Sequence, residues 1–343
     1  MHLTLLVPEL IWPEPGDSFT LGKLAAPGLE WLLAHARLER HRRLPFETAL
    51  GKLFGFDNAP FGALRLLGED RQAARAGHWL CADPVHLRFH QERIILADAS
   101  AFDIEISEAQ ALAAALNSEF ADLGEFHVAH PQRWYLRLKV ALEHRSQPLS
   151  AVAGRRVDGE LGSSALPLTR RLNEIQMFMH GHPINQQREA AGKPAVNSLW
   201  LWGGGELDQN LRSPPGSALL SDHPLAAGLA ETAAIRLLTP PANLDALLAC
   251  GEKAPLLVLD QLLPAVLGEN SEHWRSDFAR MDNDWFIPLK NALGRRIDRI
   301  NLIAPCVYGE LHYTLTAGER WKFWKRPLPL QVTARNLAES PTP

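Results

Sequence analysis

Two pairs of closely spaced histidines are candidates for binding a metal ion. His180 and His182 flank a single glycine, and two imidazoles at that spacing could bind one metal ion. Because a proline follows His182, we expect a turn in which its side chain makes a structural hydrogen bond instead. His86 and His90 lie in an alternating, strand-like run, where four-residue spacing places them too far apart to share a metal.

Three consecutive glycines, Gly203–Gly205, follow the apolar run SLWLW. Glycines after a strand can point backbone N–H groups at a phosphate. This run has neither G-x-x-x-x-G-K-[ST] nor G-x-G-x-x-G spacing, so we interpret it as the end of a strand. We expect that strand to be buried, with Trp200 and Trp202 on one face and the neighbouring leucines on the other.

Two basic segments could bind anions. The segment RLERHRR at 37–43 predicts a solvated helix face, with anion binding as the alternative. The segment ERWKFWKRPLPL at 319–330 alternates aromatic and basic residues, as do segments that bind single-stranded nucleic acid or phospholipid surfaces. Because it is short and isolated, we expect an edge strand with Trp321 and Phe323 buried. An exposed aromatic surface for a partner is the alternative.

The composition limits the function classes. A net charge of −4 gives no overall attraction to nucleic acid or acidic lipid, so we expect neither as the partner. Cys81, Cys250 and Cys306 lack C-x-x-C spacing, which predicts no disulfide framework or thiolate zinc site and favours a cytoplasmic protein. The N-terminal residues MHLTLLVPELIWPEPG have no basic region, so we interpret them as a first strand and not a signal peptide.

Strand and helix patterns alternate along most of the 343 residues. Apolar runs such as LTLLV, LLVLD and INLIAP are separated by helices of crossover length, among them one that Asn243 can cap, which predicts a doubly wound, largely parallel α/β sheet. Residues 77–165 instead have a β-β-α-β pattern, with Ser107 as a helix cap and a polar linker from about 144. We therefore expect a body formed by 1–76 and 166–343, and an inserted smaller α+β module at 77–165.

The segment HPINQQREAAGKPAVNSLWLWGGG at 182–205 resembles H-P-[VI]-N-x-x-R…G-x-x-x-A-N-x-[IL]-W-L-W-G of archaeal-type cofactor-independent phosphoglycerate mutases, in the alkaline phosphatase superfamily. Residues 26–33, APGLEWLL, are similar to that family's T-P-N-L-D-x-L, and 44–58, LPFETALGKLFGFDN, to its P-G-S-D-x-A-x-L-S-L-L-G-Y-D-P. The resemblance implies an alkaline phosphatase-like body with an insertion domain. The matching positions in the first motif are His182, Asn185, Arg188, Asn197, Trp200 and Trp202.

The resemblance also implies where a catalytic site would lie. Enzymes of that superfamily use two metal ions and a hydroxyl nucleophile for phosphoryl transfer. The resemblance places Phe46 at the position of the nucleophilic serine, and a phenyl ring cannot attack phosphorus. Thr48 is the nearest hydroxyl and a weak substitute, so we expect no catalytic residue there.

The metal ligands are largely replaced as well. Glu9 follows the first strand where the family has aspartate, and Ala304-Pro305-Cys306 replaces A-D-H, which removes hard-cation ligands. The segment 269–277 matches D-x-x-G-H-x-G-D only in spacing, and could hold one divalent ion or begin an ordinary helix. We expect no metal. The weak candidates are Glu9, Glu269, His273, Asp277 and His312.

These replacements favour a catalytically degenerate protein, a pseudoenzyme, that binds a phosphorylated metabolite or an unidentified protein partner and has a regulatory role. Bacterial regulatory proteins of the RpfE type also resemble these mutases, and the chain resembles that branch. The alternative is an active metal-dependent phosphomutase or phosphatase with a relocated nucleophile. Only that alternative requires manganese, magnesium or zinc.

Overall fold

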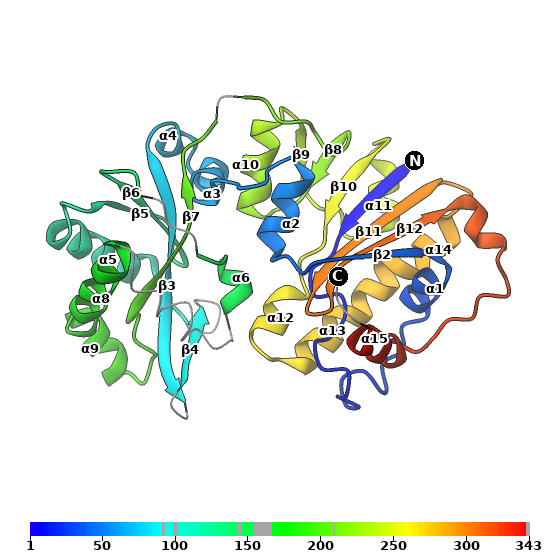
Figure 1. Cartoon of the computed structure of the whole chain (residues 1–343), viewed down its shortest axis with the longest axis horizontal. Coiled ribbons are helices and arrows are strands. Elements are labelled where there is room, and N and C mark those ends of the chain that lie inside the picture. The colour runs from blue at the N-terminus through cyan, green and yellow to red at the C-terminus, as the bar shows by residue number, and fades with distance from the viewer. Residues whose placement is uncertain (91–92, 99–101, 143–145, 154–166, 209, 341–343) are drawn as a thin grey trace. The chain divides into compact units, whose positions relative to one another are not determined.

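The computed structural model describes residues 1–90, 93–98, 102–142, 146–153, 167–208 and 210–340, which form two compact units (Figure 1). The first unit consists of Met1–Gly55, Leu211–His223 and Ala233–Pro343, and the second of Phe56–Asn210 and Pro224–Thr232. Both boundaries expected for an inserted module, near 77 and 165, fall within the second unit. Within the described ranges, none of the helices has the length and apolar character needed to cross a bilayer.

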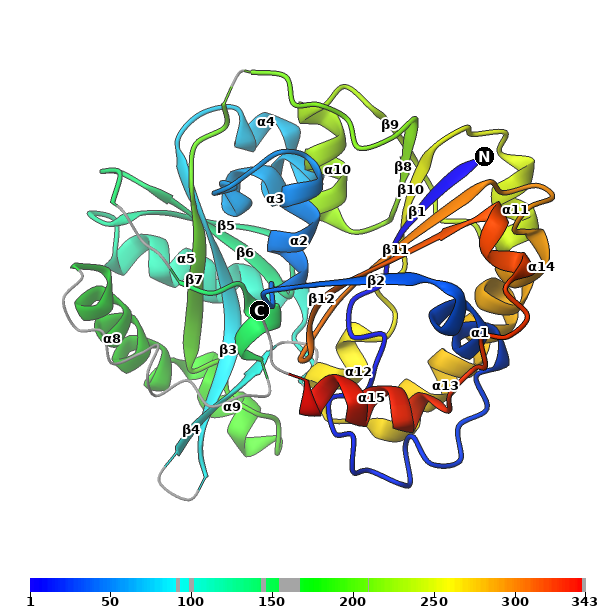
Figure 2. The same ribbon diagram turned by 45° about the vertical axis from the view of Figure 1, so that its right-hand side comes forward.

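The first unit contains a mixed, mostly parallel sheet of seven strands. Five neighbouring strands are parallel, and two antiparallel strands extend one edge (Figure 2). The parallel strands are short apolar runs, which is typical of strands buried on both faces. This arrangement confirms the predicted α/β class with a largely parallel sheet. In spatial order the strands are β2 (Arg37–His41), β12 (Gly309–Thr316), β11 (Arg299–Cys306), β1 (His2–Leu6), β10 (Pro255–Val258), β8 (Ala218–Leu220) and β9 (Arg236–Leu238).

Helices of the first unit share an apolar core with this sheet. Leu3 and Leu5 of β1 belong to the same buried cluster as Trp274 and Phe278. Asp282, which begins the π-helical turn after α13, fixes the start of α1. Its carboxylate accepts hydrogen bonds from the backbone N–H groups of Gly28 and Leu29, at 3.1 and 2.8 Å. The helices are α1 (Pro27–His35), α2 (Phe46–Leu53), α11 (Leu244–Ala249), α12 (Leu263–Leu267), α13 (Ser271–Met281), α14 (Ile287–Ala292) and α15 (Leu330–Glu339), with a π-helical turn (Asp282–Phe286) between α13 and α14.

The prediction of a solvated helix at 37–43 is wrong. Helix α1 ends at His35, and Ala36 adopts extended backbone angles that start β2. This strand pairs with β12 along five residues, and Arg40 donates a hydrogen bond from Nε to the Tyr308 carbonyl at 2.6 Å. Pairing with a strand that is distant in sequence therefore outweighs the local helical pattern.

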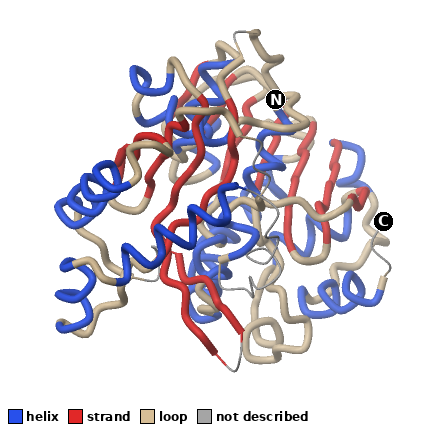
Figure 3. The backbone as a smooth tube through the Cα atoms, turned by 60° about the vertical axis from the view of Figure 1, so that its left-hand side comes forward, coloured by secondary structure: helices blue, strands red, loops and turns tan. Residues whose placement is uncertain are grey.

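The second unit contains an antiparallel sheet of five strands, visible as the long red strands of Figure 3. Strand β3 is its longest strand and pairs with three others. The strands are β3 (His78–His90), β4 (Arg93–Asp98), β5 (Gly124–His130), β6 (Arg133–Leu138) and β7 (Ser198–Gly205). The helices are α3 (Phe61–Glu69), α4 (Arg71–Ala74), α5 (Ile106–Glu119), α6 (Leu149–Val152), α8 (Pro167–His180), α9 (Pro183–Ala190) and α10 (Pro224–Thr232).

Strand β7 is buried, as predicted for SLWLW, but it pairs with β3 of the antiparallel sheet and so lies outside the parallel one. Its leucines join the core of the second unit. Its glycines allow close packing: a Cβ on Gly203, where φ is 65°, would lie 2.6 Å from the Phe61 Cβ, and one on Gly205 equally close to the Pro60 Cβ. The glycine run is therefore part of a packed strand.

Of the two helix caps predicted from the sequence, Asn243 is correct and Ser107 is wrong. Asn243 accepts a hydrogen bond from the Ala246 N–H at 3.0 Å, which confirms it as the cap of α11. Helix α5 instead begins after Glu105, which forms a reciprocal capping box with Glu108, so Ser107 is not the cap. Most of the predicted linker at 144–167 lies outside the described residues.

The prediction of an edge strand with buried aromatic residues in 319–330 is also wrong. Residues Ala317–Trp321 form a 3-10 helix, and the chain then continues without regular structure to α15. Trp321 and Phe323 are exposed by 75% and 88%. Among the strands of the described residues, none comes from 319–330, so the segment extends neither sheet.

Candidate functional site

The carboxyl ends of the parallel strands form the candidate site in the first unit. Strands β1, β8, β10 and β11 run in the same direction, so the residues that follow them meet at one edge of the sheet. In α/β sheets this edge is the usual place for ligands. The residues brought there are Glu9, Ser221, Asp222, His223, Asp260, Pro305 and Cys306.

Phe46 is buried at the start of α2 and contacts this edge. Only 3% of its surface is exposed, and its ring packs edge-on against His223, with ring centroids 5.2 Å apart. Thr48 lies one half-turn further along the helix and is partly exposed. The position that resembles the nucleophile is thus occupied by an apolar ring in contact with an imidazole.

Glu9 and Cys306 lie together at the ends of adjacent strands. Glu9 is buried in a left-handed conformation, with φ of 53°, and its N–H donates to the Pro305 carbonyl at 2.9 Å. Burial, followed by the nearby charge of Glu9, raises the pKa of the Cys306 thiol to about 12. Since the thiolate is the form that binds metals and attacks electrophiles, a thiol that keeps its proton at neutral pH is a poor ligand and a poor nucleophile.

Two carboxyl groups at the same edge were missed in the sequence. Burial, and then the like charge of Asp222, raises the pKa of Asp260 to about 6. A carboxyl group with this pKa exchanges protons near neutral pH, as general acids and bases do. A usable signal was present, because both residues directly follow apolar strand runs.

The three residues in the 269–277 segment do not converge on a metal site. Glu269 is in the exposed turn before α13, whereas Asp277 is buried and contacts both His273, at 3.1 Å, and Arg280. Asn270 caps the helix through its side chain. Among the residues that the structure describes, no group of three or more His, Cys, Asp or Glu side chains could hold a metal ion.

His312 lies on β12 and contacts another residue of the same strand. Its Nε2 is 2.7 Å from Oε1 of Glu310, and its ring packs edge-on against His41 of β2. These contacts couple two antiparallel strands at the edge of the sheet. The contacts of His312 with Glu310 and His41 are therefore contacts between and within these two strands.

The H-P-x-N motif in the second unit is a compact set of backbone contacts. His182 precedes α9, and its Nδ1 accepts a hydrogen bond from the Ile184 N–H at 3.3 Å. Asn185 is fully buried: its amide donates to the carbonyls of Met179 and Val196, at 2.7 and 2.8 Å, and accepts from the Val196 N–H. The structural hydrogen bond predicted for His182 is confirmed, and Asn185 satisfies three backbone groups around the turn.

Arg188 and Asn197 complete the motif by binding other segments. Arg188 is buried and contacts the Glu108 carboxylate at 2.7 Å, as well as the carbonyls of Pro194 and Asp103. Asn197 makes paired hydrogen bonds to the N–H and carbonyl of Leu87. These side chains hold α9 and the start of β7 against α5 and β3.

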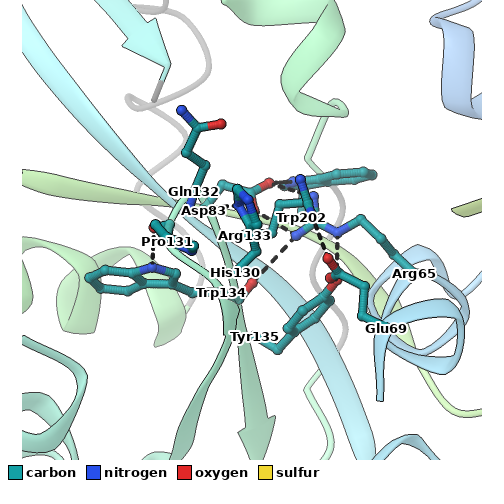
Figure 4. Close-up of polar contacts among 10 residues, drawn as sticks. All are labelled: Arg65, Glu69, Asp83, His130, Pro131, Gln132, Arg133, Trp134, Tyr135 and Trp202. Carbon is teal, nitrogen blue, oxygen red and sulfur yellow. Dashed lines mark hydrogen bonds and ion pairs between the residues drawn. The ribbon is translucent and has the colours of Figure 1, made fainter. Parts of the chain in front are cut away.

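A buried ion-pair network connects α3 to the sheet of the second unit (Figure 4). Arg65 donates two hydrogen bonds to the Asp83 carboxylate, at 3.0 and 2.6 Å, and one to the Tyr135 hydroxyl. Burial is the largest single influence and lowers the pKa of Arg65, but the charges of Asp83, Cys81 and Tyr135 and the hydrogen bond to Asp83 together raise that pKa well above its usual value. Trp202 donates to Asp83 at 2.7 Å, which explains the second indole of the W-L-W run.

Glu69 ends the same network nearer the surface. It accepts from the Tyr135 hydroxyl and from Nε of Arg133, the latter at 2.5 Å. Burial raises the pKa of Tyr135 well above its usual value, so the phenol keeps the proton that it donates. Trp200 is held separately, by donation to the Gln147 carbonyl at 2.9 Å. The charged groups of the network are paired with one another inside the unit, so the network has a structural role: it holds α3 against β3 and β6.

Comparisons with known proteins agree with the motif resemblance. No protein-family model matches the chain. A 2,3-bisphosphoglycerate-independent phosphoglycerate mutase from Methanosarcina barkeri is 25% identical over 207 residues, 55% of this chain and 50% of that protein. A second such mutase, from Methanothermobacter thermautotrophicus, is 32% identical over 143 residues, 39% of this chain and 35% of that protein. The chain thus spans at most about half the length of the curated relatives it matches.

Two solved structures are similar over nearly the whole chain. The PH0037 protein from Pyrococcus horikoshii aligns with a TM-score of 0.52 at 14% identity, covering 98% of this chain and 95% of that one, which shows a shared fold. A cofactor-independent phosphoglycerate mutase from Thermoplasma acidophilum aligns with a TM-score of 0.45 at 18% identity, covering 97% and 95%. From the sequence matches, the chain is a distant homologue of the archaeal-type cofactor-independent phosphoglycerate mutases of the alkaline phosphatase superfamily.

Proposed function

We propose that this chain is a catalytically inactive homologue of phosphoglycerate mutases, of the RpfE regulatory type, that acts by binding a phosphorylated metabolite or a protein. The observation that carries the proposal is the burial of Phe46 against His223 at the position of the nucleophile. A serine at that position would need a metal ion or a base beside it, and here the neighbour is packed against an apolar ring.

Other groups at the carboxyl edge of the sheet support the same proposal. Cys306 is a buried neutral thiol at the position of a ligand, and proline precedes it. A nucleophile and its metals act as a unit, so loss of one member already removes most of the rate. The remaining carboxyl pair, Asp222 and Asp260, can still hydrogen-bond a ligand that enters this edge of the sheet.

The test is an assay of the purified full chain with manganese, magnesium and zinc. We expect phosphoglycerate interconversion and p-nitrophenyl phosphate hydrolysis to stay at background for the wild type and for Thr48→Val. Metal-dependent turnover that Thr48→Val abolishes would overturn the proposal and establish a relocated nucleophile. Thr333→Val on α15 is a matched control that leaves the candidate edge intact.

Binding is tested in the same preparation by thermal shift. Stabilisation by 3-phosphoglycerate that inorganic phosphate does not reproduce would support a metabolite ligand at the carboxyl edge. Asp222→Asn is the matched variant. It removes one negative charge at this edge without removing apolar contacts, so it should raise the affinity for an anion. An unchanged melting temperature with phosphorylated metabolites would leave protein binding as the role.

A further inference from the structure

The segment Arg320–Arg326, here called the basic-aromatic turn, exposes three large rings between β12 and α15. Trp321, Phe323 and Trp324 are exposed by 75%, 88% and 64%. The turn lies in the orange-red stretch that leads to α15 at the right of Figure 1. Large exposed apolar side chains that are contiguous in this way mark interaction sites, whereas isolated ones do not.

The turn also concentrates positive charge on a chain whose net charge is negative. It contains Arg320, Lys322, Lys325 and Arg326, and the one acidic residue next to it is Glu319. Glu319 pairs with the two lysines, at 2.8 and 3.7 Å, and the hydrogen bond from Lys322 is the main cause of its lowered pKa. The cations exceed the single anion, so a partner that complements the turn is anionic.

Hydrogen bonds hold the turn in a defined conformation. The N–H groups of Lys322, Phe323 and Lys325 donate to carbonyls two or three residues earlier, at 3.0 to 3.1 Å. Nζ of Lys325 also donates to the His35 carbonyl at the end of α1, which anchors the turn to the first unit. Lys325 therefore holds the turn against α1, while the three rings remain exposed.

The ring geometry distinguishes among anionic partners. Phe323 and Trp324 are nearly perpendicular, with an interplanar angle of 79°, so they offer no common face on which successive bases could stack. The Arg320 guanidinium lies over the Trp321 ring, 6.0 Å from its centre, and would compete with a base for that face. Single-stranded nucleic acid is therefore disfavoured.

A protein partner is disfavoured by area. Stable protein interfaces contribute about 800 Å² from each side, and three aromatic side chains of about 150–250 Å² each supply only part of this. A lipid interface needs no complementary shape. It accepts tryptophan and phenylalanine rings at the headgroup level and attracts the lysine and arginine residues around them.

We propose that the basic-aromatic turn binds reversibly to the surface of anionic phospholipid membranes, with its three rings inserted at the headgroup level. This inference is independent of the proposed function, because the turn contributes no residue to the carboxyl edge of the sheet. It also revises the expectation that the chain has no membrane partner. That expectation rested on the net charge of −4 of the whole chain, whereas the turn concentrates positive charge locally.

Co-sedimentation of the purified full chain with vesicles tests the proposal. We expect binding to phosphatidylcholine vesicles that contain about one third phosphatidylglycerol, and loss of binding as salt screens the surface charge. Arg326→Gln weakens binding about fivefold, as expected for one basic residue near an anionic surface. Phe323→Ala and Trp324→Ala each weaken it by about tenfold or more, since each removes the burial of a large ring.

Met177→Ala is the matched control, because Met177 is 79% exposed on α8 of the second unit. It should bind vesicles like the wild type, and all variants should keep the wild-type melting temperature because their side chains are exposed. Absence of wild-type binding, equal binding to pure phosphatidylcholine, or undiminished binding of the Phe323→Ala/Trp324→Ala double variant would each overturn the proposal. Tighter binding to oligo(dT) than to anionic vesicles would also overturn it, in favour of nucleic acid.

Discussion

Phe46 and His223 pack edge-on, with ring centroids 5.2 Å apart and an interplanar angle of 80°. One ring begins α2 and the other follows β8, so this contact joins a helix to the carboxyl edge of the parallel sheet. The phenyl ring covers one side of an imidazole that is otherwise partly exposed. Phe46 therefore has a packing role, and its contribution can be measured as a change in the free energy of unfolding.

Phe46→Ser should lower the free energy of unfolding by about 3–5 kcal/mol, the range found when a buried phenyl ring is removed. It should not produce phosphatase turnover, since Cys306, at the end of β11, stays a neutral thiol in place of a metal ligand. Urea unfolding and a phosphatase assay with manganese check the two statements. Phe323→Ser, at an exposed ring, is the control and should change stability by less than about 0.5 kcal/mol.

Asp260→Asn should stabilise the protein at pH 7 by about 1–3 kcal/mol. The pKa of Asp260 is about 6 in the folded chain, against about 4 when unfolded. Between these values the folded state binds more protons, so this carboxyl lowers the stability as pH rises from about 4 to 6. The gain from the substitution should therefore be small at pH 4, grow between pH 4 and 6, and be nearly complete at pH 7.

Urea unfolding at several pH values checks this dependence. Asp245→Asn is the matched control, because Asp245 is exposed and its replacement should have little effect at any of these pH values. A stabilisation of equal size at pH 4 and pH 7 would contradict the assignment, because it could not arise from ionisation of Asp260.

Local patterns predicted the elements whose formation depends on nearby residues. The Asn243 cap, the burial of β7 and the parallel strands follow from spacing and composition within a few positions. The helix expected at 37–43 failed because β12, whose paired residues lie 269 to 277 positions further along the chain, supplies a strand partner. The expected edge strand at 319–330 failed because hydrogen bonds within the segment and to His35 form a turn instead.

The candidate site was predictable only in part, and for similar reasons. Resemblance pointed to Phe46, and the strand ends before Asp222 and Asp260 carried a readable signal. The ion-pair network of the second unit carried none. Its partners are between 18 and 119 residues apart, and neither Arg65 nor Asp83 has a neighbour in sequence that suggests pairing.

Arg65→Met should lower the free energy of unfolding by about 3–5 kcal/mol, because it leaves the buried Asp83 charge without its partner. The double variant Arg65→Met/Asp83→Leu should recover part of this loss, since it removes the uncompensated charge. Arg170→Met is the control: Arg170 pairs with Glu174 on the exposed face of α8, and its loss should cost less than about 1 kcal/mol. A double variant no more stable than Arg65→Met would show that packing, and not charge, dominates.

Asn185→Leu should lower the free energy of unfolding by at least about 3 kcal/mol, because three buried backbone groups lose their partner. Gln186→Leu, at the exposed neighbouring residue, is the control and should have little effect. Asn185→Asp separates hydrogen bonding from volume. Its carboxylate would face two carbonyl oxygens, whereas a protonated carboxyl could donate to one of them, so its destabilisation should be smaller at pH 4 than at pH 7. Full stability of both Asn185 variants would contradict a structural role for this part of the motif and indicate a ligand contact in its place.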